Sequence, residues 1–286
     1  MAGSGSRSVP KKRTGWRSRP SATSSRADRE ADVTTIQAIF FDQDGVIIDT
    51  ERDGHRVSFN ETFREFGFDF AWDVDEYHAL LQVAGGKERM KHYWQTKGFG
   101  KPLAPDEVDD LIARMHKRKT ALFIEMVESG RLPLRPGVRR FMQEAVAAGL
   151  RLGVCTTSNE KAAHAIAYQI LKDIPFEFVL AGDVVEKKKP APDIYNLGLA
   201  KTGLTPDQVF VVEDSRNGVL AGKAAGMRVL ATTNVYTEKE DLSPAEIIVS
   251  CLGDPDGEKA ILRKGPPEVV RDGVVHVAAV VEALGG

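Results

Sequence analysis

The chain has 286 residues and a formal net charge of −2, and its 42% hydrophobic content is enough for a sizeable core in one or two domains. Residues 1–27 carry seven Lys and Arg side chains and no acid, so the chain from residue 28 onward has a net charge of −9. This acidic body excludes a nucleic-acid-binding domain, and no apolar run reaches the ~18 residues that a membrane-spanning helix needs.

The first 33 residues are expected to form a disordered basic arm, because they are rich in Ser, Gly and Pro and poor in apolar side chains. The arm lacks the apolar centre of a secretory signal, but its Arg and Ser content is also that of an organellar transit peptide. Cys155 and Cys251 are isolated in the sequence, which favours a reducing compartment. We therefore expect a cytoplasmic protein, or one of an organelle stroma or matrix if the arm is a transit peptide.

The first predicted element is a buried strand over the apolar residues 36–41. Asp42 and Asp44 follow it, and a spacing of two sends both carboxylates to the same side of an extended backbone. Gly45 then allows the chain to turn sharply. Two acids at the end of a buried strand need a compensating cation, proton or substrate, although an Asx turn that caps the next helix is an alternative.

Residues 51–132 are predicted to be helical, because their apolar side chains recur at helical spacing. One helix is expected to end at Gly67, and others to cover residues 74–83, 87–97 and about 105–126. We interpret residues 51–132 as an all-helical domain inserted into an α/β core that comprises residues 34–50 and 133–286.

The rest of the chain is predicted to alternate between strands and helices. Strands are expected over residues 151–155, 178–180, 208–212, 228–231 and 247–249, and helices over 138–148, 160–171, 192–202, 218–225 and 274–284, the last with an extended lead-in. Such alternation implies an α/β fold, in which helices cover both faces of a parallel sheet.

Polar residues follow four of the predicted strands, namely residues 42–44, 156–159, 182–189 and 213–218. Because ligands of an open parallel sheet bind outside the carboxyl ends of its strands, these groups are expected to converge. Carboxylates suit Mg²⁺, whereas Thr156, Lys189 and backbone N–H groups suit phosphate oxygens. Phosphoryl transfer needs this combination, with one Asp as nucleophile and a second as general acid and base.

This sequence resembles the haloacid dehalogenase superfamily over about residues 35–251, because it holds the superfamily's four motifs in order: Asp42-Gln43-Asp44-Gly45, Thr156, Lys189 and Glu213-Asp214. The resemblance implies that Asp42 is the nucleophile and Asp44 the general acid and base. It also implies that Thr156, Thr157 and Lys189 bind the phosphoryl group.

The same resemblance implies a Mg²⁺ site. Asp42, the backbone carbonyl of Asp44 and Asp214 would hold the ion, with Glu213 close by. The dehalogenase branch of the superfamily lacks an acid at the position of Asp44, so the acid in this sequence implies phosphate chemistry.

The predicted helical domain is similar to the cap of relatives that include β-phosphoglucomutase and phosphoglycolate phosphatase. Residues 59–63, 80–81, 85–89 and 215–218 resemble the CbbY-type phosphatases, which act on xylulose 1,5-bisphosphate. Lys87 and Arg89 would then hold the distal phosphate, unless they lie on an ordinary solvated helix face. His55 stands one residue later than the substrate histidine of that subgroup, so its role is open between substrate binding and the surface, and Asn217 is a further candidate.

We therefore predict a Mg²⁺-dependent phosphatase of a small sugar phosphate, with a cap that closes to exclude water and select the substrate. A sugar phosphomutase, a phosphoglycolate phosphatase and a silent binding module are the alternatives, and the intact set of motifs argues against the last. The expected partner is a small phosphorylated molecule, with no nucleic acid and no membrane. Because the cap must move, we expect a monomer.

Overall fold

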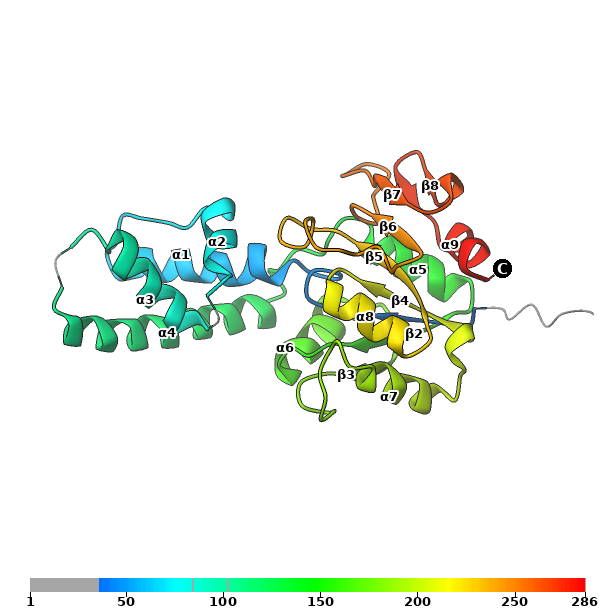
Figure 1. Ribbon diagram of the computed structural model, residues 1–286, viewed down its shortest axis with the longest axis horizontal. Helices are drawn as coiled ribbons and strands as arrows, with labels where there is room; N and C mark the ends of the chain where they lie inside the picture. Colours follow the sequence, from blue (N-terminus) through cyan, green and yellow to red (C-terminus); the bar gives the residue numbers. More distant parts are fainter. Residues whose placement is uncertain (1–35, 84, 102, 286) are drawn as a thin grey trace, which may run out of the picture. The chain divides into compact units, whose positions relative to one another are not determined.

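The computed structural model describes residues 36–83, 85–101 and 103–285 (Figure 1). Its central element is a seven-stranded sheet with the order β3-β2-β1-β4-β5-β6-β7. All neighbours from β3 to β6 are parallel, and β7 runs antiparallel to β6. The predicted α/β fold is therefore confirmed, whereas the predicted basic arm lies outside the described residues.

The strands of the sheet are β1 (Ala38–Phe41), β2 (Arg151–Cys155), β3 (Phe176–Leu180), β4 (Val209–Glu213), β5 (Arg228–Thr232), β6 (Ile247–Val249) and β7 (Leu262–Lys264). A separate hairpin consists of β8 (Val270–Arg271) and β9 (Val274–Val275). The sequence predicted the first six strands but not β7 or β8. Because β7 reads Leu-Arg-Lys and lies at the edge of the sheet, its own composition does not favour a strand, and pairing with β6 decides its conformation.

Strand β1 lies at the centre of the sheet, where Ala38 is aligned with Arg151 of β2 and Val209 of β4. All four residues of β1 are buried, which explains why its sequence is continuously apolar instead of alternating. The register brings Phe41 beside the penultimate residue of both neighbours. The residues that follow β1, β2 and β4 therefore leave the sheet at the same level.

Helices cover both faces of the sheet, as the sequence predicts. They are α5 (Val138–Ala147), α6 (Glu160–Ala165), α7 (Asp193–Thr202), α8 (Arg216–Ala224) and α9 (Val277–Gly285), with the shorter turns η2 (Ile166–Ile170), η3 (Pro206–Gln208) and η4 (Pro267–Val269). Ile39 and Phe41 of β1 belong to a hydrophobic cluster with α5 and α9. Phe40 belongs to another cluster with α7 and α8, because alternate side chains of a strand point to opposite faces.

Between β1 and α5 the chain forms η1 (Thr50–His55), α1 (Arg56–Glu65), α2 (Val74–Leu80), α3 (Gly86–Lys97) and α4 (Pro105–Glu128). We call residues 50–128 the helical module. It has a hydrophobic cluster of its own, in which Phe59, Trp72 and Met115 are fully or almost fully buried. Although α4 has 24 residues, no helix of the described ranges is both long and apolar enough to cross a membrane.

Candidate active site

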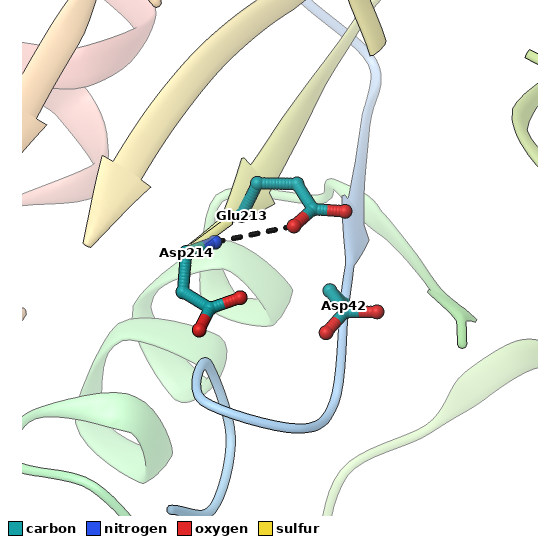
Figure 2. A group of neighbouring side chains, drawn as sticks. All are labelled: Asp42, Glu213 and Asp214. Carbon is teal, nitrogen blue, oxygen red and sulfur yellow. Dashed lines mark hydrogen bonds between the residues drawn. The ribbon is translucent and has the colours of Figure 1, made fainter. Parts of the chain in front are cut away.

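Three carboxylates gather at the carboxyl ends of β1 and β4. Asp42 follows β1, Glu213 ends β4, and Asp214 comes next. One oxygen of each lies within 4.8 Å of the others, and Figure 2 shows the three side chains together. All three are buried. The structure thus brings together acids that are separated by some 170 residues in the sequence, as parallel pairing of β1 and β4 requires.

Lys189 places a positive charge among these acids. Its Nζ lies 2.5 Å from Oδ1 of Asp42 and 2.7 Å from Oε1 of Glu213, and it donates to the carbonyl oxygen of Cys155 at 2.9 Å. Burial disfavours the charged amine, but the two carboxylates outweigh it and raise the pKa of Lys189. Burial also raises the pKa of Asp42, while Lys189 opposes that change. Lys189 therefore stays protonated at neutral pH.

Both oxygens of Glu213 are occupied by donors from the protein. Oε1 accepts hydrogen bonds from Lys189 and from the hydroxyl of Tyr195. Oε2 accepts the backbone N–H of Asp214 at 3.2 Å, the bond drawn in Figure 2. Burial, followed by the charge of Glu213, raises the pKa of Tyr195, so this phenol remains a donor. Glu213 therefore holds Lys189 in place and is not free to turn toward a ligand.

Asp42 and Asp214 each retain one oxygen for a cation. Lys189 contacts Oδ1 of Asp42, and the side-chain amide of Asn234 donates to Oδ2 of Asp214 at 2.7 Å. No residue in the described ranges donates a hydrogen bond to the other oxygen of either carboxylate. Burial and the neighbouring acids Glu213 and Asp42 raise the pKa of Asp214. Lys189 contacts Asp42 and Glu213, and the charge of Arg135 acts on Asp214. Three carboxylates thus outnumber their two cations, and their hard oxygen donors fit a divalent cation such as Mg²⁺.

Asp44 is held by two hydroxyl groups. Thr50 donates to its Oδ1 at 2.6 Å, and Ser158, which follows β2, donates to its Oδ2. Burial raises the pKa of Asp44 to about 6, and the bond from Thr50 limits the rise. A carboxyl group with a pKa near neutrality can both give and take a proton at pH 7. The alternative of an Asx turn is wrong, since Asp49 caps η1 by accepting a hydrogen bond from the N–H of Arg52.

The turn after Asp44 is fixed by Gly45 and Arg135. Gly45 has a φ of 81°, and a Cβ there would lie 2.0 Å from Oδ2 of Asp214, so this position requires glycine. The guanidinium of Arg135 donates to the carbonyl oxygens of Gly45, Thr233 and Ser250 and to the hydroxyl of Thr232. Arg135 thereby joins the segments that follow β1, β5 and β6.

The two threonines that follow β2 differ in their surroundings. Thr156 is buried, and its hydroxyl accepts the N–H of Ser158 at 3.1 Å. Thr157 is exposed and lines a shallow groove with Gly182 and Lys188. Only Thr156 therefore lies in the buried part of the site.

A cavity of about 630 Å³ lies beside Asp44. Its polar lining includes Asp44, Glu51 and Ser158. Its apolar lining comes from α4, α6 and η2, among others from Phe123 of α4 and Ile166 of η2. The volume is within the range of small-molecule sites. The sheet and the helical module therefore share one cavity at the candidate acid and base.

His55 lines this cavity together with Lys119 of α4. The Nζ atom of Lys119 lies 2.7 Å from Nδ1 of His55, and the imidazole packs on Phe123 with ring centroids 4.0 Å apart. Burial and then the charge of Lys119 lower the pKa of His55 to about 3, and burial lowers the pKa of Lys119 to about 8. At pH 7 a charged Lys119 therefore donates to Nδ1 of a neutral imidazole, whose hydrogen is on Nε2.

The other three predicted substrate-binding residues, Lys87, Arg89 and Asn217, do not line the cavity. Arg89 is only 9% exposed, so it does not lie on a solvated helix face, and it donates to the carbonyl oxygen of Leu80 and the hydroxyl of Tyr77, both at 3.0 Å. Lys87 is exposed on α3, and Asn217 is exposed in the first turn of α8.

The site is also shaped by residues that were given no role of their own in the sequence analysis, among them Thr50, Lys119, Arg135, Ser158, Tyr195 and Asn234. Ser158 and Asn234 follow β2 and β5, so their position after a predicted strand could have identified them. Lys119 and Tyr195 lie within helices, and no local pattern distinguishes them from other helical residues.

The comparisons with known proteins agree on one family. The family model of haloacid dehalogenase-like hydrolases matches residues 36–226. A CBBY-like protein of Arabidopsis thaliana is 46% identical over 232 residues, which are 79% of this chain and 73% of that protein. Protein CbbY of Rhodobacter capsulatus is 40% identical over 214 residues, 74% of this chain and 91% of that protein. The crystal structure of a mutant CbbY from Rhodobacter sphaeroides in complex with xylulose-(1,5)bisphosphate has a TM-score of 0.55 and 37% identity, and the match covers 74% of this chain and 93% of that one.

Proposed function

Because the chain belongs to the haloacid dehalogenase-like hydrolase family and is an enzyme of the phosphatase type, we propose that it hydrolyses a small sugar phosphate and that xylulose 1,5-bisphosphate is its first candidate substrate. The observation that carries the proposal is the buried contact of Asp42 with Lys189, next to Asp214 and the cavity at Asp44. The bisphosphate is suggested by the ligand of the similar CbbY structure.

In the proposed reaction a carboxylate oxygen of Asp42 attacks phosphorus, the bond from phosphorus to the sugar oxygen breaks, and an aspartyl-phosphate forms. Water then attacks the phosphorus, phosphate leaves, and the carboxylate of Asp42 is restored. Lys189 and Thr156 bind phosphoryl oxygens, and Thr157 is the third proposed phosphate-binding residue. Glu213 supports the step by holding Lys189 beside Asp42.

Asp42, Asp214 and the backbone carbonyl of Asp44 are the proposed ligands of Mg²⁺, with Glu213 beside them. Bound Mg²⁺ would offset the negative charge of the phosphate, so that an anionic nucleophile can approach it. Asp42 and Asp214 support this assignment because each retains a carboxylate oxygen that no described residue engages.

Asp44 is the proposed general acid and base. It gives its proton to the leaving sugar oxygen and later takes a proton from the attacking water. The hydroxyls of Thr50 and Ser158 orient its carboxyl group, which lines the cavity. A pKa of about 6 supports this exchange at neutral pH.

The helical module, within the predicted domain of residues 51–132, is the proposed cap. His55 lines the cavity and would contact the substrate through Nε2. Lys87 and Arg89 would hold a distal phosphate after closure, and the Nη2 atom of Arg89 has no acceptor among the described residues. Asn217 remains a further proposed contact at the start of α8.

Phosphate release from a panel of phosphorylated sugars, bisphosphates and phosphoglycolate tests the proposal. We expect the fastest release from the ketopentose bisphosphate with Mg²⁺, and none with EDTA. Asp42→Asn should abolish release because it removes the nucleophile, whereas Asp183→Asn, at a carboxylate whose side chain is 93% exposed, should retain wild-type rates. Isomerised sugar phosphate without free phosphate would show a mutase, and preference for phosphoglycolate would reject the sugar substrate.

We further infer a monomer that works in a reducing compartment, the cytoplasm or an organelle stroma. Cys155 and Cys251 are both buried free thiols, which is the state that a reducing compartment maintains. Light scattering of the purified chain would measure its mass in solution.

A further inference from the structure

Tyr236 connects the sheet to the helical module. It lies in the segment after β5, and its ring makes edge contacts with Tyr77 and His78 of α2, at centroid distances of 6.3 and 5.2 Å. The other members of the hydrophobic cluster that Tyr236 joins lie between residues 59 and 115, inside the helical module. The hydroxyl of Tyr236 is buried, and no residue of the described ranges forms a hydrogen bond with it. The ring, not the hydroxyl, therefore makes the contact.

Asn234 fixes the segment of Tyr236 to the candidate metal-binding acids. Its Nδ2 donates to Oδ2 of Asp214 at 2.7 Å, and its Oδ1 accepts the N–H groups of Tyr236 and Thr237 at 2.9 and 3.1 Å. The N–H of Asn234 donates to the hydroxyl of Thr237 at 3.2 Å. The side chain of Asn234 thus links the backbone of Tyr236 directly to Asp214.

Tyr77 continues this connection from Tyr236 to Arg89. The hydroxyl of Tyr77 accepts a hydrogen bond from Nη1 of Arg89 at 3.0 Å, and the guanidinium lies 5.2 Å from the centre of its ring. The same hydroxyl donates to Glu51 at 2.6 Å, and Arg89 also donates to the carbonyl oxygen of Leu80, the last residue of α2. The position of Arg89 therefore follows the position of α2.

We propose that Tyr236 is a positioning residue that sets the place of Arg89 relative to Asp214, and that it thereby selects substrates with two phosphates. The inference rests on the proposed function, in which Arg89 holds the distal phosphate while Asp214 holds the cation at the reacting one. A bisphosphate must meet both groups at one fixed separation, so a shift of α2 weakens its binding. A substrate with one phosphate needs only the groups around Asp42 and is indifferent to that separation.

Kinetics of Tyr236→Ala and Tyr236→Phe in the full-length chain test this inference. With xylulose 1,5-bisphosphate, Tyr236→Ala should raise KM about five- to tenfold, the loss expected for one aromatic contact, and change kcat less than about twofold. With acetyl phosphate, which has no second phosphate, its KM should remain that of the wild type. Tyr236→Phe should restore wild-type KM because it keeps the ring, and Tyr168→Ala, at an exposed tyrosine of η2, is the matched control.

An equal loss of activity on both substrates would show a general packing role and overturn the inference, as would an unchanged KM in Tyr236→Ala. Amide hydrogen exchange in α2, measured without substrate, gives a second readout. Exchange of residues 74–80 should become faster in Tyr236→Ala and stay unchanged in Tyr236→Phe. If the wild type does not prefer the bisphosphate, the proposed function fails and substrate selection fails with it, whereas exchange still shows whether Tyr236 holds α2.

Discussion

Burial sets the charge of the residue pair formed by Lys119 and His55. Lys119 is 7% exposed, and its pKa is lowered to about 8 by desolvation, then raised in part by Glu51. A lowered amine pKa means that the cation is present below pH 8 and lost above it. Since the pKa of His55 is about 3, the imidazole stays neutral throughout this range. Lys119 is therefore the group of this pair that titrates near physiological pH.

We predict that kcat/KM for the sugar bisphosphate falls above pH 8, by about tenfold per pH unit, because Lys119 then loses the proton that it donates to His55. A profile of kcat/KM between pH 6 and 9 measures this. In Lys119→Arg the fall should move beyond pH 9, since guanidinium stays charged. Lys117→Arg, at an exposed lysine of the same helix, should keep the wild-type profile. The same fall in Lys119→Arg would contradict the assignment.

At the residue scale, the sequence was sufficient to predict the site residues that come directly after a strand. It predicted that Asp42, Lys189 and Asp214 would meet, because strand ends of a parallel sheet share one edge, and the structure places them together. It gave no role to Lys119 or Tyr195, because each reaches the site through the packing of a helix. Such packing leaves no pattern in the local sequence.

Among the elements, α8 shows how a helix start is shaped by the strand before it. A Cβ on Gly218 would lie 1.9 Å from Oε2 and 2.1 Å from Oε1 of Glu213. Because Lys189 and Tyr195 both donate hydrogen bonds to Oε1 of Glu213, this side chain can move away only by disturbing those two contacts. Position 218, in the first turn of α8, therefore requires glycine.

We expect Gly218→Ala to lower the free energy of unfolding by about 1–3 kcal/mol, the usual range for overpacking, although alanine normally favours a helix. Phosphate release should fall as well, because a displaced Glu213 moves Lys189. Urea denaturation measures the stability. Gly285→Ala is the control, since a Cβ at this position of α9 would have no neighbour within 4 Å. A Gly218→Ala variant as stable as the wild type would show that Glu213 can move.

The sequence predicted the boundaries of an element well where its apolar pattern was long, as in α4, and less well in β3 and α6. Strand β3 begins at Phe176, two residues before the start that the sequence predicted. The sequence missed these two residues because they are partly or fully exposed and are not part of the apolar run that ends the strand. The helix expected over residues 160–171 divides into α6 and the wider turn η2 at Ile166. A change of helical pitch leaves the apolar periodicity almost unaltered, so the sequence does not reveal it.

For the whole molecule, the excess of negative charge in the buried site means that cation binding should stabilise the folded state. Three buried acids cluster there, and Lys189 forms ion pairs with two of them, Asp42 and Glu213. A cation that binds the folded state alone adds about 2.7 kcal/mol of stability at a hundred times its Kd. The site should therefore report Mg²⁺ binding even when no substrate is present.

We predict that saturating Mg²⁺ raises the melting temperature by about 5–8 °C over that in EDTA, given the size of the protein. Thermal unfolding followed by circular dichroism measures this shift without relying on turnover. Asp214→Asn should remove most of it, and Asp183→Asn, at the exposed carboxylate, should keep it. Equal melting temperatures with Mg²⁺ and with EDTA would reject the cation site.

The central place of β1 also has a consequence for synthesis on the ribosome. Strand β1 is made first, but its partners β2 and β4 follow roughly 110 and 170 residues later. At about 5–20 residues per second this delay is roughly 6–22 seconds for β2 and 9–34 seconds for β4. During this interval the helical module emerges, and among the described residues its hydrophobic cluster lacks only Tyr236, which is made after β4. The nascent chain thus carries most of the hydrophobic cluster of the helical module, together with an apolar strand that must be shielded until β4 emerges.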